Sequence, residues 1–256
     1  GASSLGGADG RVSISGNGRF VAFATTDNTL VPGDTNVCDG EGTCMDVFVY
    51  DRELDTLQRV SVGDDGRQAN GHSRWPVVSD DGRYVAFASS ATNLGVSVDE
   101  DTNGIEDVFV HDRCLVNGVV LGDCTSHTER VSVTNDEEQA IGSDVQPRRL
   151  DMSADGRFVV FDFYSTNLPY GFDFGMESGV YLRDRVDGRT DPISFGEFGF
   201  APSISSDGRY VAFEHINGFF GRGLTDVVLY DRTTGVPTFV NQLPDGTLPP
   251  DQSSFA

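Results

Sequence analysis

Two loops rich in aspartate and asparagine contain the residues best suited to chemistry in this sequence. In one of them, the oxygen-bearing side chains of Asp101, Asn103 and Asp107 alternate with other residues around a glycine. Calcium takes about six to eight oxygen ligands from carboxylates, side-chain amides and main-chain carbonyls, and such spacing is typical of calcium loops. We therefore predict a bound calcium ion, with Asp101, Asn103, Asp107 and the carbonyl oxygen of Ile105 among its ligands.

The other loop offers Asp34, Asn36 and Asp46 as a second set of calcium ligands, interrupted by a cysteine-containing insertion. The competing interpretation is that Asp, Asn and Gly are also the residues that any exposed turn uses. The corresponding loops at residues 167–179 and 217–226 contain few acidic residues. We predict that calcium is the cofactor of this protein and that these two later loops bind none.

The four cysteines occur as two close pairs, Cys38 with Cys44 and Cys114 with Cys124, each within a polar loop insertion. Two local disulfides are the simplest interpretation, and they indicate an oxidising compartment with no spare thiol. Zinc is the alternative for paired cysteines. It is disfavoured because neither pair has Cys-x-x-Cys spacing and no histidine stands at ligand spacing from either pair.

The sequence contains none of the motifs that indicate a familiar catalytic centre. It has no Gly-x-Ser-x-Gly nucleophile elbow, no His-Glu-x-x-His motif and no phosphate-binding glycine loop. All 18 basic residues are arginine, which excludes lysine nucleophiles and Schiff bases. Paired carboxylates for glycoside chemistry stay an alternative, because many pairs among 40 acidic residues can lie at a suitable separation.

The formal net charge of −22 argues against two classes of partner. A field of this sign repels the phosphate backbone of nucleic acids and the surface of anionic membranes. The sequence also has no apolar run long enough to span a bilayer and no visible signal peptide, as expected of a mature chain or an excised piece. We predict no nucleic-acid partner and no membrane insertion.

One sequence repeat occurs four times and accounts for nearly the whole chain. It begins with a Ser-x-Asp-Gly-Arg or Ser-x-Asn-Gly-Arg turn that leads into an apolar strand, and a second apolar strand follows after a loop. Asp-Gly and Asn-Gly favour tight hairpin turns. The turn and first strand occupy residues 15–23, 79–87, 153–161 and 205–213, and the second strand occupies residues 46–52, 107–113, 179–185 and 226–232.

Both faces of these strands are apolar, so each copy is expected to be sandwiched between its neighbours. The Arg-Val-Ser-Val segments at residues 59–62 and 130–133 alternate polar and apolar residues, which predicts a more exposed outer strand. Stacked four-stranded units usually close radially. The predicted fold class is all-β, a β-propeller of four-stranded antiparallel blades. It forms a single domain over residues 1–256, with blades at about residues 11–75, 76–148, 149–201 and 202–256.

The phrase Ser-x-Asp-Gly-Arg-Tyr-Val-Ala-Phe, followed by Asp-Val-Phe-Val-x-Asp-Arg, resembles the TolB-type, WD-like β-propeller repeat of bacterial envelope and secreted proteins. The match is looser in the third copy, where Gly179 replaces the aspartate found at Asp46 and Asp107. The family commonly has six or more blades, so four copies imply a small ring, part of a larger ring, or a protomer completed by a partner. The terminal segments at residues 11–14 and 237–240 allow closure within one chain or strand donation between chains.

Two groups of residues are candidates for ligand contact. His72, Arg74 and Trp75 lie just before a blade's first apolar strand, where propellers often build their central opening, although such a cluster is more often structural. His111 instead takes the place of a tyrosine in the other copies and is expected to be a strand residue. The aromatic side chains of the two loops with few acids also mark either a contact surface or packing beneath the loop. These are Phe172, Phe219 and Phe220.

Architectural motifs outnumber catalytic ones, which favours a non-catalytic binding or assembly module stabilised by calcium and disulfides. We expect it to be secreted, periplasmic or at a bacterial-type cell surface, and to present a propeller face or its loops to a protein or a glycan. A homo-oligomer or filament formed through blade edges or termini is expected if the blades do not close. The alternative is a carbohydrate-active enzyme, a hydrolase or lyase, that uses acidic residues around the central channel.

Overall fold

The computed structural model describes residues 11–38, 42–95, 101–142, 149–169, 178–194, 198–216 and 225–241. Every regular element in these ranges is a β-strand, so the prediction of an all-β chain is confirmed. Within the same ranges, no helix is long and apolar enough to cross a membrane.

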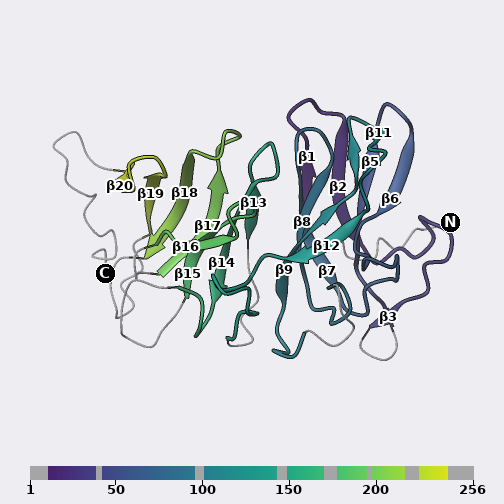
Figure 1. Ribbon diagram of the computed structural model, residues 1–256, viewed down its shortest axis with the longest axis horizontal. Coiled ribbons are helices and arrows are strands. Elements are labelled where there is room, and N and C mark those ends of the chain that lie inside the picture. Colours follow the sequence, from purple (N-terminus) through teal and green to yellow (C-terminus); the bar gives the residue numbers. More distant parts are fainter. Residues whose placement is uncertain are drawn as a thin grey trace, which may run out of the picture.

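Four sheets of four antiparallel strands follow one another along the chain, as predicted (Figure 1). The first blade contains β1 (Val12–Ile14), β2 (Phe20–Thr25), β5 (Asp46–Asp51) and β6 (Thr56–Arg59). The second contains β7 (Ser73–Val78), β8 (Tyr84–Ser89), β9 (Asp107–Asp112) and β12 (His127–Arg130). The third contains β13 (Leu150–Met152), β14 (Phe158–Tyr164), β15 (Ser178–Asp184) and β16 (Arg189–Pro192). The fourth contains β17 (Phe198–Ile204), β18 (Tyr210–Ile216), β19 (Thr225–Asp231) and β20 (Val236–Phe239).

Two short ribbons decorate the first two blades. They are β3 (Val37–Cys38) with β4 (Gly42–Thr43), and β10 (Leu115–Val116) with β11 (Val119–Val120). The first ribbon lies in the long connection between β2 and β5, and the second follows β9. The insertions that lengthen these copies are therefore confined to connections between blade strands.

The Gly-Arg turn forms the hairpin predicted for the start of each blade. The arginine of the turn also forms an ion pair with an aspartate of the same blade. In the second blade, Gly82 has a φ of 73° and donates its N–H to the carbonyl of Ser79 at 3.0 Å. The guanidinium of Arg83 then binds both carboxylate oxygens of Asp112, at 2.9 and 2.7 Å. Such two-pronged pairs are strong and geometrically specific. The equivalent ion pairs in the other blades are Arg19–Asp51, Arg157–Asp184 and Arg209–Asp231.

The first strands of the second and fourth blades begin a few residues before the boundaries expected at residues 76 and 202. Both β7 and β17 contain a β-bulge, at Trp75-Pro76 and at Ala201-Pro202. A bulge leaves an extra residue unpaired and bends the strand, and proline is tolerated there because it has no N–H to give to the ladder. The prolines therefore lie inside these strands and do not mark their beginnings.

The hydrophobic core consists of three layers, one between each pair of successive blades. In the first layer, Ala22, Val47 and Val49 of the first blade pack against Val85 and Phe87 of the second. Two further clusters join the second blade to the third and the third to the fourth in the same way. We call the side of a blade that packs on the following blade its forward face, and the side that packs on the preceding blade its backward face.

The Arg-Val-Ser-Val segments are not the exposed outer strands that their alternation predicted. The outer strands β6 and β12 end at the arginine, and the Val60 and Ser61 that follow are fully buried. Val60 donates its N–H to the carbonyl of Val47 at 2.8 Å, and its side chain joins the first core layer. The polar member of the pattern is also internal, because Ser61 hydrogen-bonds to buried Asp46.

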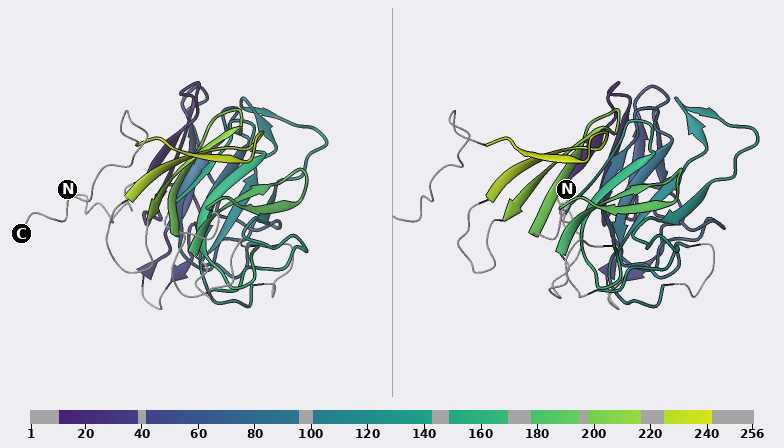
Figure 2. Two further views of the ribbon diagram at one scale, coloured as in Figure 1. Left: turned by 90° about the vertical axis from the view of Figure 1, so that its left-hand side faces the viewer. Right: turned by 60° about the vertical axis from the view of Figure 1, so that its left-hand side comes forward.

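The four blades form an open arc in the described part of the chain. Strand contacts join the first blade to the second, the second to the third and the third to the fourth. The first and fourth blades lie at opposite ends of the long axis (Figure 1). Seen from the end of the fourth blade, the later sheets stand in front of the earlier ones (Figure 2). One backward face and one forward face are therefore left at the two ends of the arc.

Candidate functional site

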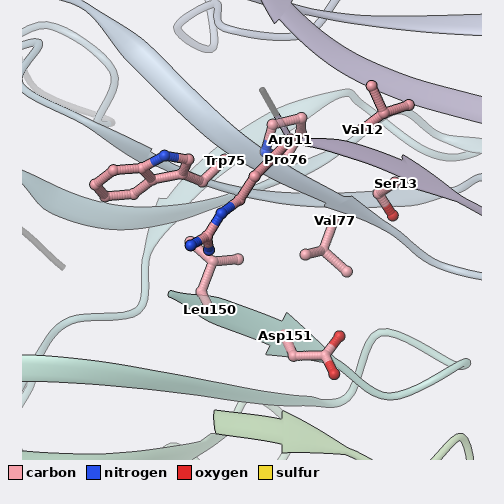
Figure 3. Close-up of a pocket in the computed structure, with 8 residues that line it drawn as sticks. All are labelled: Arg11, Val12, Ser13, Trp75, Pro76, Val77, Leu150 and Asp151. Atoms are coloured by element: carbon pink, nitrogen blue, oxygen red, sulfur yellow. The ribbon is translucent and has the colours of Figure 1, made fainter. Parts of the chain in front are cut away.

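A pocket of about 350 Å³ lies where the first strands of the first three blades meet. These strands contact one another across blades, which places the pocket on the inner side of the arc. Figure 3 shows Arg11 reaching between Trp75 and Leu150, with Asp151 on the opposite side of the pocket. The lining residues are Arg11, Val12, Ser13, Trp75, Pro76, Val77, Leu150 and Asp151.

Trp75 is the most distinctive residue of the pocket. It occupies the bulge of β7 with a φ of 55°, in the left-handed region that large side chains rarely adopt. The guanidinium carbons of Arg11 and Arg74 lie 5.7 and 5.8 Å from the centre of its ring. Cations at this distance from an indole are attracted by its electron-rich face. Two arginines thus fix a half-buried indole at the pocket.

The second acidic loop is linked to this tryptophan through a shared hydrophobic cluster and through Arg74. Ile105 packs against the same hydrophobic cluster as Trp75. The neighbouring Glu106 has a side chain only 1% exposed, and its carboxylate lies 3.2 Å from Nε of Arg74. The loop that was expected to hold calcium therefore packs on the same cluster as Trp75 through Ile105 and holds Arg74 through Glu106.

The polar groups of the pocket are engaged in holding blades together. The Oδ2 atom of Asp151 accepts hydrogen bonds from the hydroxyl of Ser203 and the N–H of Ile204, at 2.8 and 2.9 Å. On the other side, the hydroxyl of Ser13 accepts the N–H of Val78 at 3.2 Å. Each of these bonds joins successive blades, so the lining polar groups give the pocket a fixed shape.

The remaining predicted contact residues lie elsewhere. His72 lies at the junction of the first two blades, where its Nδ1 accepts the N–H of Met45 at 3.0 Å, and it does not line the pocket. Phe172, Phe219 and Phe220 lie outside the described residues. Of the cluster at residues 72–75, Trp75 lines the pocket and Arg74 flanks its ring.

The two predicted calcium loops do bring their acidic residues together, but around an arginine. In the first blade, Nη1 of Arg59 lies 2.9 Å from the carboxylate of Asp34 and 3.8 Å from that of Asp46. In the second blade, Arg130 lies 3.4 Å from the carboxylate of Asp107 and 3.9 Å from that of Asp101. Equivalent side chains, two aspartates and one arginine, therefore lie together in both copies.

The asparagine of each loop turns its nitrogen inward. The amide of Asn36 donates to Asp46 and to the carbonyl of Ala69, both at 2.9 Å. Asn103 donates in the same way to Asp107 and to the carbonyl of Ala140, at 3.0 and 2.8 Å. Two acceptors fix the amide orientation in each case, because only the NH₂ group can donate.

These arrangements fit a guanidinium better than a calcium ion. Asp34, Asn36 and Asp101 each keep one buried oxygen that accepts no hydrogen bond among the described residues, and that of Asp34 forms the ion pair with Arg59. That supply is well short of the about six to eight oxygens that calcium requires, and the arginine already provides a positive charge. Burial raises the pKa of Asp107 to about 6, and the charge of Arg130 acts against this rise. Calcium binding stays an untested prediction that the observed side-chain positions do not favour.

Among the described residues of the other two blades, the arginine of this arrangement has no counterpart. Their outer strands carry Pro192 and Phe239 at the position of Arg59 and Arg130. In the fourth blade, Asp226 instead accepts a hydrogen bond from the amide of Asn241 at 2.9 Å. The arginine thus occurs in the first two blades and not at the equivalent described positions of the third and fourth.

Both predicted disulfides are present. Cys38 is bonded to Cys44 and closes the ribbon of β3 and β4, with 4.9 Å between the Cα atoms. Cys114 is bonded to Cys124 and closes the ribbon of β10 and β11, with 5.5 Å between the Cα atoms. No cysteine of the chain is left free for a metal.

Sequence reasoning missed Arg11, Ser13 and Asp151 in the pocket, and Arg59 and Arg130 in the acidic loops. The pocket residues belong to short first strands that carry no motif of their own. A signal for the arginines was present, because Arg-Val-Ser-Val occurs only in the two copies that have the acidic loop. Pairing the two features within each copy would have predicted the ion pairs.

Comparisons with known proteins agree with this architecture. No protein-family model matches the sequence, and no curated protein matches it either. TolB from Acinetobacter baumannii matches in structure with a TM-score of 0.50 and 18% identity, over 89% of this chain and 42% of that chain. Oligogalacturonate lyase from Vibrio parahaemolyticus matches with a TM-score of 0.54 and 10% identity, over 93% of this chain and 55% of that chain.

The β-propeller domain of the Trilobed protease from Pyrococcus furiosus gives a TM-score of 0.50 at 11% identity, over 90% of this chain and 55% of that chain. The fold is a TolB-like β-propeller, which confirms the resemblance seen in the repeat. The chain spans less than two thirds of the length of each of these proteins.

Proposed function

We propose that this protein is a non-catalytic binding module that presents the pocket around Trp75 to a protein partner. The observation that carries the proposal is a tryptophan held at the pocket in an unfavourable backbone conformation, between Arg11 and Arg74. Tryptophan and arginine are the residues most enriched at the energetic centres of protein interfaces. TolB-like propellers as a fold are compatible with such a role.

A comparison of the second and fourth blades shows that the bulge conformation does not require a tryptophan. Ala201 occupies the corresponding bulge of β17 with a φ of 54°, nearly the same as that of Trp75. The conformation is therefore a feature of the blade, whereas a large aromatic at this position belongs to the second blade alone. A large aromatic side chain that the bulge conformation itself does not require is a good candidate for recognition.

The two disulfides support a location outside the reducing cytoplasm, secreted or periplasmic. In such a location a rigid pocket on a preformed scaffold recognises its partner with little loss of conformational entropy. A glycan is the second class of ligand to consider, because sugar rings also pack on indole faces. The experiment below distinguishes the two classes.

The alternative of a carbohydrate-active enzyme gains no specific support from the pocket. Glycoside hydrolysis uses two carboxylates on either side of the bond that is cleaved. Asp151 is the single carboxylate among the residues that line the pocket, and its Oδ2 is bonded to Ser203 and Ile204. We therefore do not assign a catalytic role to it.

The test uses phage-displayed random peptides and a printed glycan array, probed with the whole chain and with Trp75→Ala. Ala201 indicates that alanine tolerates this backbone conformation, so the variant is expected to fold. Leu54→Ala is the matched control, since Leu54 is 54% exposed away from the pocket. We expect peptides that bind the wild type and the control but bind Trp75→Ala at least about tenfold more weakly. Equal binding by Trp75→Ala, or enrichment of glycans alone, would contradict the proposal.

A further inference from the structure

Contacts between successive blades repeat one arrangement of an aromatic ring, a glycine and an arginine. The ring of Tyr84 packs so closely on Gly156 of the following blade that a Cβ there would overlap it. The guanidinium of Arg185, also from the following blade, lies 4.4 Å from the centre of the same ring. The equivalent sets are Phe20 with Gly82 and Arg113, and Phe158 with Gly208 and Arg232.

The arginine of each set is held in place by its own blade. In the second blade, Nη1 of Arg113 donates to the carbonyl of Gly82 at 2.6 Å. In the first blade, Arg52 makes the same bond to the carbonyl of Gly18, also at 2.6 Å. Only this arginine lies within 4 Å of a Cβ placed on Gly18. The first blade therefore carries the glycine and arginine in their usual geometry, with no aromatic ring on them among the described residues.

The fourth blade carries the complementary half of the contact. Tyr210 stands at the position of Tyr84, at the start of the strand that follows the turn. Its ring is half-buried and lies 4.7 Å from the guanidinium of Arg209 in the same blade. Among the described residues, no following blade supplies it with a glycine and an arginine.

The backward face of the first blade shows the same incompleteness. Leu30 is 37% exposed, whereas Leu94 and Leu168, at the same distance after the Gly-Arg turn, are 0% and 1% exposed. Val21 and Phe23 are likewise half-buried, while their counterparts in the three later blades are buried. These apolar side chains are positioned for a preceding blade.

The forward face of the fourth blade is the opposite surface. Val227 and Leu229 are half-buried there, whereas Val108 and Val110 of the second blade are fully buried at the same register positions. Glu214 takes the place of Asp162, whose carboxylate accepts the N–H of Ala201 from the following blade at 3.2 Å. This face therefore offers both an apolar surface and an acceptor to a following blade.

We propose that the backward face of the first blade docks on the forward face of the fourth blade of a second copy of this chain. Tyr210 of one copy then lies on Gly18 and Arg52 of the other, and Leu30 is covered. The occupant is a second copy because the two faces are the two halves of a contact that the chain itself makes three times. This inference goes beyond the proposed binding role of the pocket.

The contact is head-to-tail, so it builds a ring where the rotation closes and a filament where it does not. Two copies of four blades give eight, which lies within the about four to eight blades of known propellers. The formal net charge of −22 opposes association at low ionic strength. Association is therefore expected to strengthen as salt is added and screens the repulsion.

Sedimentation velocity of the whole chain at physiological salt, over a wide concentration range, tests the proposal. Leu30→Asp places a charge on the docking face, and Val186→Asp is the matched control because Val186 is 70% exposed in the turn after β15. Near-ultraviolet circular dichroism reports whether both variants keep the native fold.

We expect the sedimentation coefficient of the wild type and of Val186→Asp to rise with concentration. Leu30→Asp is expected to raise the dissociation constant at least about tenfold. A wild type that stays monomeric throughout would overturn the proposal and indicate that other segments of the chain, or a different protein, cover these faces. Association of Leu30→Asp with unchanged affinity would overturn it as well.

Discussion

The backward faces of the first and second blades are built from the same residue types but differ in burial. Val85 and Phe87 of the second blade are fully buried, whereas Val21 and Phe23 of the first blade are half-buried. Nothing in the strands themselves accounts for this difference, because the sequences Val-Ala-Phe are identical. The repeat determines what a face is complementary to, and the presence of a neighbouring blade determines whether it is buried.

The largest effect should come from truncating the same phenylalanine in both blades. Phe87→Ala leaves a cavity in a closed core layer and is expected to lower the free energy of unfolding by about 3–5 kcal/mol. Phe23→Ala removes a ring that stacks on Phe48 at 5.9 Å but faces no other blade among the described residues, and should lower it by about 1 kcal/mol. Urea unfolding of the monomeric proteins measures both. Equal losses would mean that Phe23 is as fully packed as Phe87.

The acidic loops sharpen the comparison between the first two blades, because removal of the arginine should lower the free energy of unfolding by a similar amount in both. Arg130→Leu leaves the fully buried Asp107 without its cation and is expected to cost about 3 kcal/mol in the free energy of unfolding. Arg59→Leu should cost a similar amount, since the loop of the first blade has the same ion pairs and lies on the side with a neighbour. Arg189→Leu is the control, because its exposed pair with Asp191 is worth at most about 1 kcal/mol.

The same loops allow a direct choice between arginine and calcium as the partner of their carboxylates. We expect the melting temperature of the wild type to be unchanged by excess calcium or by EDTA, because a guanidinium already lies among the carboxylates. A rise with calcium that is abolished by Asp107→Asn would show instead that the metal binds there. The control is Asp151→Asn, since Asp151 lies in the pocket and outside these loops.

A smaller, pH-dependent effect distinguishes His111 of the second blade from Tyr50 of the first. Burial and the nearby charge of Arg113 lower the pKa of His111 from its ordinary value of 6.5 to about 4 in the folded state. Between these values the unfolded chain takes up a proton and the folded chain does not, so this contribution to stability is present above pH 6.5 and is lost as the pH falls. The expected loss is roughly 2 kcal/mol at about pH 5.

His111→Gln should remove this part of the pH dependence, because glutamine is neutral throughout the range and can still bond to Thr128 and Ser126. Unfolding curves of both proteins between about pH 7 and about pH 4 measure it. An unchanged pH profile in the variant would show that His111 does not titrate in this way.

The blades were predictable from sequence because their signals are local. Each Gly-Arg turn needs a residue that tolerates positive φ, and each following strand shows apolar residues on both faces. The outer strand was misjudged because Val60 and Ser61 alternate like surface residues, although their burial comes from the core layer and from Asp46. Alternation along one strand does not reveal what lies beyond it.

The candidate site was only partly predictable for the same reason. Trp75 stands out by type, but Arg11 and Asp151 are brought to it from segments 64 and 76 residues away in the chain, and no local pattern marks such a meeting. The acidic loops show the converse. Their acidic residues do lie together, but the arginine that pairs with them was not foreseen because it follows on a different strand, and the calcium prediction stays untested.

The most direct test of the account mixes two variants that each lose one end of the arc. Leu30→Asp disables the backward face of the first blade, and Leu229→Asp disables the forward face of the fourth. In a mixture, the intact forward face of Leu30→Asp can still bind the intact backward face of Leu229→Asp. Sedimentation equilibrium should show each variant alone as a monomer and their equimolar mixture as a one-to-one dimer. A mixture that stays monomeric even at concentrations far above those at which the wild type associates would contradict the account, because it would mean that these two faces do not bind each other.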